Sequence, residues 1–161
     1  FSYTGILPAF GAVAFQADPV GIGLLAAAEP FGALLTGLAL AMWRGAQPGR
    51  GLLAAGCCGF LCILVLAAHA PSLPLAVILL SIGGLGTAAF SSLQTGIVMM
   101  QAPPEARSRI LGLTTTCIGA GPLGVLLVGA LADAQGPRLA ITAVAVIGLA
   151  ALTLVLLFTR R

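Results

Sequence analysis

The chain has 161 residues, of which 60% are hydrophobic and 7% are charged, and its formal net charge is +3. An ordinary soluble domain carries about 25% charged residues. Seven arginines, no lysine and four acids cannot cover a globule of this size with polar surface, so its outside must face an apolar medium, the lipid bilayer. The arginines form no basic stripe with stacking aromatics, which argues against nucleic-acid binding.

Six apolar runs, separated by polar residues, proline and glycine, divide the chain. A bilayer core of ~30 Å needs about 20 helical residues, and every run except the first is close to that length. The runs cover residues 3–16, 20–42, 51–68, 74–99, 109–131 and 138–158. None shows the alternating polarity of ~10-residue barrel strands. The sequence therefore predicts an all-α polytopic transmembrane helix bundle with five complete spans and one partial span.

The arginines predict how the spans are oriented. If the partial span ends outside, one arginine, Arg138, lies in an outer loop and six lie inside. The inner residues are Arg44, Arg50, Arg107, Arg109, Arg160 and Arg161. Short inner loops are enriched in Lys and Arg. We therefore expect a multi-pass protein of the cell (inner) membrane with a cytoplasmic C-terminus.

Small residues inside the spans predict close helix packing. The stretch SIGGLGTAAFSS, residues 81–92, carries Gly83, Gly84 and Gly86. Such small-residue faces let helix backbones approach closely where water supplies no driving force between helices. We expect these glycines to lie at contacts between spans.

The hexapeptide GAGPLG matches the pattern G-x-G-x-x-G, but a dinucleotide site needs a preceding strand and a soluble βαβ unit. Here the motif lies in the middle of an apolar span, so no cofactor is expected. Pro122 leaves the carbonyl of Ile118 without its usual helical donor. The motif instead predicts a closely packed helix that can bend, at Gly119, Gly121, Pro122 and Gly124.

Polar groups within and between the spans leave two hypotheses open in each case. Ser91, Ser92 and Gln94 either line a substrate path or form hydrogen bonds between helices. Glu105 shares the inner segment APPEARSR with two arginines. These charges, with those of the other inner loop, are either topology anchors or a latch of ion pairs, which are weak individually when exposed. The charges in question are Arg44, Arg50, Glu105, Arg107 and Arg109.

The sequence offers no catalytic or metal-binding cluster. Its cysteines, Cys57, Cys58, Cys62 and Cys117, all lie in apolar runs, where free cysteine behaves as a small hydrophobic residue. A membrane enzyme would need His, Asp, Glu or Cys side chains gathered near an interface, and no such pattern is present. We therefore expect neither a metal nor an enzymatic activity.

Glu29 is the acidic residue that lies deep within a span. It stands about nine residues into its run, ~13 Å deep at ~1.5 Å per residue. An ionised side chain there costs about 2.5–3.5 kcal/mol, so it usually faces a cavity or a partner. Pro30 also leaves the carbonyl of Ala26 without a donor. We interpret Glu29 as a carboxylate that couples protons or binds substrate in a central cavity. The alternative is a protonated glutamate that hydrogen-bonds a neighbouring helix.

Taken together, the spans resemble the C-terminal half of a major facilitator superfamily transporter. LPAFGAVAF looks like the end of the seventh helix, and VGIGLLAAAEPFGALLTGLALA resembles the eighth. PPEARSRILGL looks like the inner loop before the eleventh helix, and GPLGVLLVGALADAQGPR resembles that helix and its turn. Because the chain opens at Phe1 within an apolar run, we expect a fragment with a truncated seventh helix and complete eighth to twelfth helices.

The resemblance implies one half of a twelve-helix secondary transporter, which works by alternating access with an N-terminal half as its partner. It implies efflux of a small molecule, a drug or a metabolite, driven by an ion gradient such as protons. The rival hypothesis is a non-transporting polytopic scaffold or subunit. A water-accessible Glu29 would favour transport, and a dry Glu29 bonded to a neighbour would favour the scaffold.

The arginine distribution generates a test of sidedness. In a background without the native cysteines, Ala46→Cys should react with a membrane-impermeant thiol reagent added to the cytoplasmic side alone. Gln135→Cys should react from the outside alone, because the inner loops hold the arginines. Reversed labelling would contradict the orientation and every loop assignment that follows from it.

Overall fold

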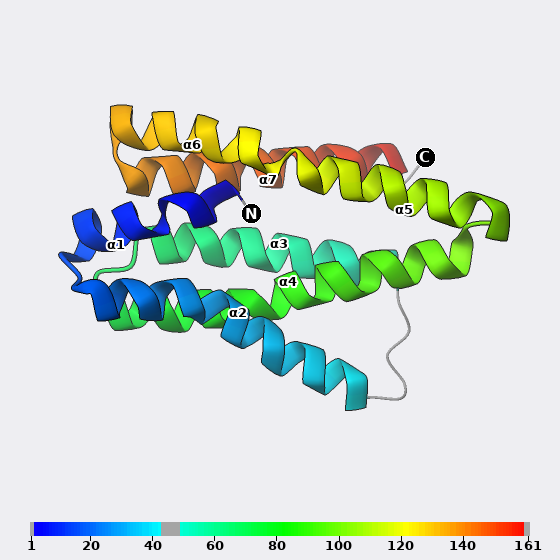
Figure 1. The fold of residues 1–161 in the computed structure, drawn as a ribbon, viewed down its shortest axis with the longest axis horizontal. Coiled ribbons are helices and arrows are strands. Elements are labelled where there is room, and N and C mark those ends of the chain that lie inside the picture. Colours follow the sequence, from blue (N-terminus) through cyan, green and yellow to red (C-terminus); the bar gives the residue numbers. More distant parts are fainter. Residues whose placement is uncertain (1, 43–48, 160–161) are drawn as a thin grey trace.

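The computed structural model describes residues 2–42 and 49–159, and these form a bundle of helices (Figure 1). Predictions that fall on Arg44, Ala46, Arg160 and Arg161 lie outside the described residues. The helices are the 3-10 helix η1 (Ser2–Ile6) and the α-helices α1 (Leu7–Phe15), α2 (Pro19–Met42), α3 (Arg50–Ala68), α4 (Leu73–Gln101), α5 (Pro104–Gly119), α6 (Gly121–Gln135) and α7 (Pro137–Thr159).

Five helical segments are long and apolar enough to cross a membrane, which confirms the predicted polytopic bundle. Four of them are single α-helices, and α5 and α6 together make the fifth. A shorter apolar segment, Ser2–Phe15, corresponds to the partial span. The turns α1–α2, α3–α4 and α6–α7 lie at one end of the bundle, and the α4–α5 turn lies at the other (Figure 1).

The segment APPEARSR, which was predicted to be an inner loop, is largely helical. Helix α5 begins at Pro104, so Glu105, Arg107 and Arg109 lie in its first turns. Proline is favoured at the first helical position because it has no N–H to leave unpaired there. Glu105 in the first turn also complements the positive end of the helix dipole. These two local effects let α5 begin at Pro104, so the helix includes the polar residues that were expected to form a loop.

Helix α4 lies between α2 and α3 and packs on both through glycine. A Cβ atom added at Gly84 would overlap the carbonyl oxygen of Glu29 on α2. One added at Gly86 would lie 2.5 Å from the carbonyl oxygen of Gly56 on α3. Gly83 faces Phe60 at an ordinary contact distance of 3.4 Å. The α4 backbone therefore touches the backbones of both neighbours, which a residue with a side chain would prevent.

Two spans are bent where proline removes a backbone donor. Helix α2 contains Pro30, and its second half diverges from α4 (Figure 1). The fifth span breaks at Ala120, between α5 and α6. There the N–H of Ala120 donates to the carbonyl of Thr116 at 3.2 Å, and the N–H of Leu123 donates to the carbonyl of Ala120 at 3.1 Å. Both bends coincide with the proline positions at which the helical ladder loses a hydrogen bond.

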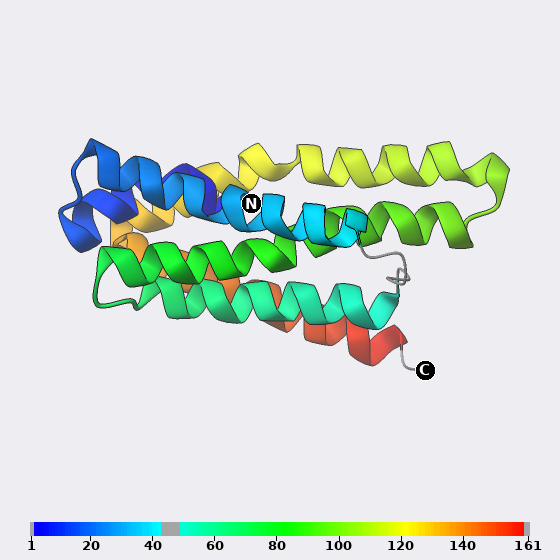
Figure 2. The ribbon, with the colours of Figure 1, turned by 90° about the horizontal axis from the view of Figure 1, so that it is seen from below.

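Helix α5 stands apart from the core. It has no buried residue, whereas α4 buries seven. Figure 2 shows α5 along one edge of the bundle and the C-terminal part of α7 along the opposite edge. Its main contacts are with its neighbours along the chain, α4 and α6. The α5 surface is therefore free for lipid or for another part of the protein.

The contact at Gly84 generates a stability test. Gly84→Ala should lower the stability of the full-length protein by about 1–3 kcal/mol, because the new methyl overlaps a backbone oxygen that cannot rotate away. Gly83→Ala is the matched control, since its methyl would meet Phe60 at an ordinary distance. Thermal unfolding of the purified protein measures both. Equal melting temperatures for the two variants would contradict the close α2–α4 crossing.

Candidate functional site

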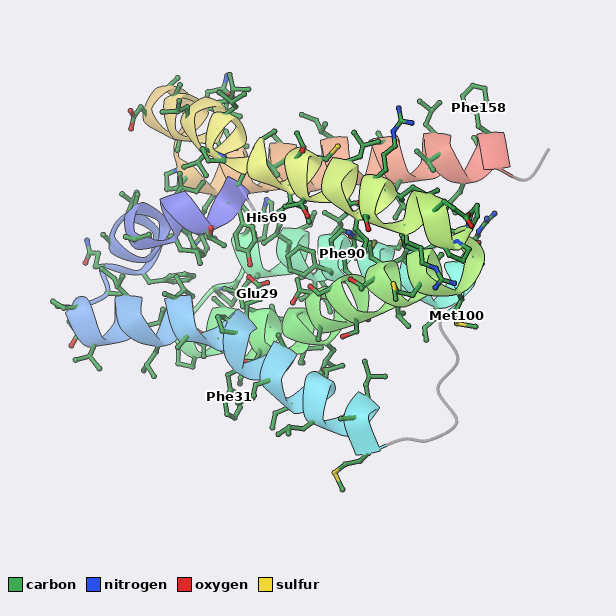
Figure 3. The ribbon with its side chains drawn as sticks, turned by 45° about the vertical axis from the view of Figure 1, so that its right-hand side comes forward. Glu29, Phe31, His69, Phe90, Met100 and Phe158 are labelled. Carbon is green, nitrogen blue, oxygen red and sulfur yellow. The ribbon has the colours of Figure 1, made fainter. Side chains whose placement is uncertain are left out.

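Glu29 is buried inside the bundle and has a partner. Its residue surface is 7% exposed, and its Oε2 atom accepts a hydrogen bond from the hydroxyl of Tyr3, which is 1% exposed. Figure 3 shows Glu29 in the interior of the bundle, whereas Phe31, two residues further along α2, points away from it. The pair therefore joins α2 to η1, the start of the partial span.

Tyr3 is held from two further sides. Its ring packs against Phe60 of α3, with ring centroids 5.9 Å apart and an interplanar angle of 52°. The η1 backbone lies against α6, because a Cβ atom added at Gly5 would lie 2.5 Å from the Cγ1 atom of Val125. The absence of a side chain at Gly5 permits this approach. The Tyr3 hydroxyl is therefore positioned by packing against α3 and α6 rather than by its own flexible torsions.

The polar atoms of this region are satisfied. Among residues 2–42 and 49–159, no buried side-chain nitrogen or oxygen lacks a hydrogen-bond partner. An unpaired polar group in an apolar interior would cost several kcal/mol. In this arrangement Glu29 is a nearly enclosed carboxyl bonded to a neighbour. That is the geometry that the scaffold hypothesis expects.

Thr87 is a second buried polar residue near Glu29, and no sequence motif singled it out. It is 8% exposed, and its hydroxyl donates to the carbonyl of Gly84 at 3.0 Å. Gly84 is the residue against which the Glu29 carbonyl packs. The Thr87 hydroxyl and the Glu29 carbonyl, one from α4 and the other from α2, therefore both lie next to Gly84. The signal available in the sequence was a lone hydroxyl within a small-residue face.

A groove of about 410 Å³ lies beside the pair, between α3, α4 and the α5–α6 break. Its walls are mainly apolar and include Phe60, Phe90 and Ile118, with Ser2 and Thr87 as polar groups. Phe60 also contacts the Tyr3 ring, so the groove and the Tyr3–Glu29 pair share this side chain. Small-molecule sites are typically apolar with a few placed polar groups. This groove has that composition.

The other in-span polar residues lie elsewhere. Ser91, Ser92 and Gln94 are not among the residues that line the groove. The Ser91 hydroxyl donates to the carbonyl of Thr87, one turn earlier, at 3.1 Å. Ser92 is exposed, and Gln94 is half-buried. Hydroxyls in helices commonly bond back to the preceding turn in this way. Their role in a substrate path stays a prediction.

Gly121 lines the groove at the α5–α6 break, and Gly124 lies beside it on α6. A Cβ atom at Gly124 would overlap the Ser2 hydroxyl, so η1 and α6 approach closely there. Gly119 and Gly121 have open space where a side chain would be. The motif GAGPLG therefore combines a helix break with one close contact to the span that carries Tyr3.

At the opposite end of the bundle, the predicted inner charges have neutral partners. Arg50 donates through Nη2 to Oε1 of Gln101 at 2.9 Å, which joins the start of α3 to the end of α4. Arg107 donates through Nε to the carbonyl of Ala102 at 3.2 Å. Glu105 forms no ion pair with any arginine in the part of the chain that the structure describes. The latch of ion pairs stays a prediction, and this arrangement shows amide and carbonyl acceptors in its place.

Comparison with known proteins adds two findings. The family model described as Major Facilitator Superfamily matches residues 1–161. A protein named multidrug efflux pump Tap, from Mycolicibacterium fortuitum, is 28% identical over 120 residues, which are 74% of this chain and 29% of that protein. The matched part of the chain thus spans less than a third of this curated relative. No solved structure matches the chain.

The Tyr3–Glu29 contact generates a double-mutant test. Tyr3→Phe and Glu29→Leu should each lower stability by about 1–3 kcal/mol, because each leaves a buried partner unsatisfied. The combined variant should be more stable than the sum predicts, because it removes both polar groups. Thermal unfolding of the four full-length proteins measures the coupling. Strictly additive losses would show that the two side chains do not interact.

Proposed function

The chain belongs to the Major Facilitator Superfamily, and from that premise we propose that the whole protein is a secondary active transporter working by alternating access. We further propose that it exports a small molecule, a drug or a metabolite, and that an ion gradient drives the export. The name of the relative from Mycolicibacterium fortuitum supports export. Under this proposal the protein lies in the cell membrane with its C-terminus in the cytoplasm, in line with the arginine distribution.

The buried carboxyl of Glu29 carries the proposal. Among residues 2–42 and 49–159, the hydroxyl of Tyr3 donates a hydrogen bond to it. A protonated carboxyl needs few partners, but an ionised one offers about four acceptor positions and is costly inside a membrane. Loss of the proton would therefore favour a rearrangement that brings Glu29 to water. We propose that protonation closes the Tyr3–Glu29 contact and that deprotonation opens it, which links proton movement to helix movement.

The groove beside the pair supports an apolar substrate. Phe60 contacts both the groove and Tyr3, so a molecule in the groove would press on the wall that positions the Tyr3 hydroxyl. Its few polar groups suit a compound with limited hydrogen-bonding capacity. The proposed substrate is therefore a largely apolar small molecule.

The exposed surface of α5 supports the expectation of a second half. Leu113 and Ile118 are 66% and 52% exposed, and the helix buries no residue. Apolar surface of this kind must be covered by lipid or by protein. We propose that the N-terminal half of the transporter and lipid share this surface.

The second candidate function is a non-transporting membrane scaffold or subunit. The closed contact between Glu29 and Tyr3 favours it, because a permanent structural pair would have this geometry. The two candidates differ in what the pair does over time. A transporter breaks and remakes the contact, and a scaffold keeps it.

Accumulation by the wild type separates a transporter from a scaffold, and substitution of Glu29 separates a coupling role of this residue from a structural one. In the full-length protein, Glu29→Gln should retain substrate binding and lose proton-driven accumulation, because an amide keeps the shape and cannot cycle a proton. Glu29→Asp should keep partial activity, since its carboxyl is drawn back by one methylene. Asp133→Asn is the matched control, because it makes the same carboxyl-to-amide change at an exposed residue. Transport into proteoliposomes with an imposed proton gradient measures all four proteins.

A coupling role and a structural role of Glu29 in a transporter predict different results for Glu29→Gln, whereas a non-transporting scaffold predicts no accumulation by any of the four proteins. The coupling role predicts loss of accumulation with membrane insertion unchanged, because a neutral side chain is easier to bury than an ionised one. A structural role predicts wild-type accumulation, because glutamine can still accept the Tyr3 hydrogen bond. Normal pumping by Glu29→Gln would rule out Glu29 as the proton carrier.

A further inference from the structure

Arg138, at the start of α7, is bound by the ends of two other helices. Its Nη1 atom donates at 3.0 Å to the carbonyl of Ala68, the last residue of α3, and at 3.2 Å to that of Ala70, in the turn after α3. Its Nη2 atom donates to the carbonyl of Ala14, in the last turn of α1, in a longer contact of 3.4 Å. One side chain therefore holds together α1, α3 and α7 at the same end of the bundle.

The acceptors explain why a cation is placed there. The last carbonyls of a helix lack helical donors and carry the negative end of the helix dipole. Arginine presents five donors in a planar fork, which lets one side chain satisfy several carbonyls at once. Two aromatic rings of α1 complete the site, with the guanidinium carbon 5.9 Å from the centroid of Phe10 and 5.3 Å from that of Phe15.

No carboxylate within the described residues forms an ion pair with this guanidinium, so its neutral partners hold it. Arg138 was the exception to the inner location of the arginines. The predicted orientation of the spans gives no reason for a cation at this end. The hydrogen bonds from Arg138 to the carbonyls at the helix ends supply that reason.

The bound helix α1 is continuous with η1, which carries Tyr3. Helices η1 and α1 together form one apolar helical segment, Ser2–Phe15. Phe10, in the middle of this segment, is 1% exposed. A helical segment transmits an axial position along its length, because its backbone hydrogen bonds fix the rise per residue. Holding Ala14 and Phe15 therefore also sets the height of the Tyr3 hydroxyl against Glu29.

We propose that Arg138 is a positioning residue for the Tyr3–Glu29 pair: it fixes the register of Ser2–Phe15 against α3 and α6. This inference rests on the proposed function for its consequence in transport, and the register itself can be measured separately. In the transport cycle, Arg138 holds the outer end of the first segment while the contact at Tyr3 opens and closes.

Disulfide cross-linking measures the register in the full-length protein with its native cysteines replaced. The reporter is Gly5→Cys with Val125→Cys, whose Cβ atoms would lie 3.6 Å apart, close to the ~3.8 Å of a disulfide. The control is Gly56→Cys with Ala89→Cys, between α3 and α4, at 3.3 Å. Arg138→Gln should slow cross-linking of the reporter roughly tenfold, because it removes charge-assisted hydrogen bonds. It should leave the control unchanged.

Arg138→Lys keeps the charge but not the planar fork, so it should give an intermediate rate for the reporter. If Arg138→Gln also abolishes the control cross-link, Arg138→Lys tests the inference instead. For this variant we expect a slower reporter cross-link and an unchanged control cross-link. An unchanged reporter rate in the variants that keep the control would overturn the inference.

A transport measurement distinguishes positioning of the Tyr3–Glu29 pair from a role of Arg138 in stability alone. Arg138→Gln and Tyr3→Phe should each lower proton-driven accumulation, and the double variant should be no worse than the poorer single one, because both act on one contact. Multiplying losses would overturn the positioning role. If Glu29→Gln pumps normally while Arg138→Gln still slows the reporter, the proposed coupling role of Glu29 fails and the register role stands.

Discussion

A polar group in the hydrocarbon of a membrane must find its partner within the protein, and in this chain that constraint falls on Glu29. Its hydrogen bond from Tyr3 requires η1 to reach the middle of the bundle, beside Phe60. Close packing makes this possible, because Gly5 lets η1 approach α6. The carboxyl therefore determines where the partial span must lie.

Helix α4 is the central helix against which α2 and α3 pack. Gly84 and Gly86 bring its backbone against α2 and α3 at once, so the three helices form one rigid layer. The bend at Pro30 lies within α2, and the break at Ala120 lies between α5 and α6. These two bends would allow the part of α2 beyond its glycine contacts, and α5 and α6, to shift while the contacts of α4 at Gly84 and Gly86 are kept. Discrete rearrangement of packed elements is how such proteins switch state.

The sequence predicted the spans and Glu29, because both depend on local properties: the length of an apolar run and the cost of a charge within it. It did not predict Tyr3 as the partner, because Tyr3 lies 26 positions away and the contact needs the three-dimensional arrangement. The early start of α5 at Pro104 was missed because the polar residues suggested a loop. Arg138 looked like an exception to orientation, since its carbonyl acceptors are backbone groups with no sequence signal.

The central claim is that the Tyr3–Glu29 contact opens and closes as the protein changes state. Structures of the full-length protein, trapped by binders in its inward-open and outward-open forms, would test it most directly. The account predicts that the Tyr3 hydroxyl bonds Glu29 in one form, and that in the other the two separate and Glu29 faces a water-filled cavity. An intact contact in both forms would contradict the account and leave the pair as a permanent structural link.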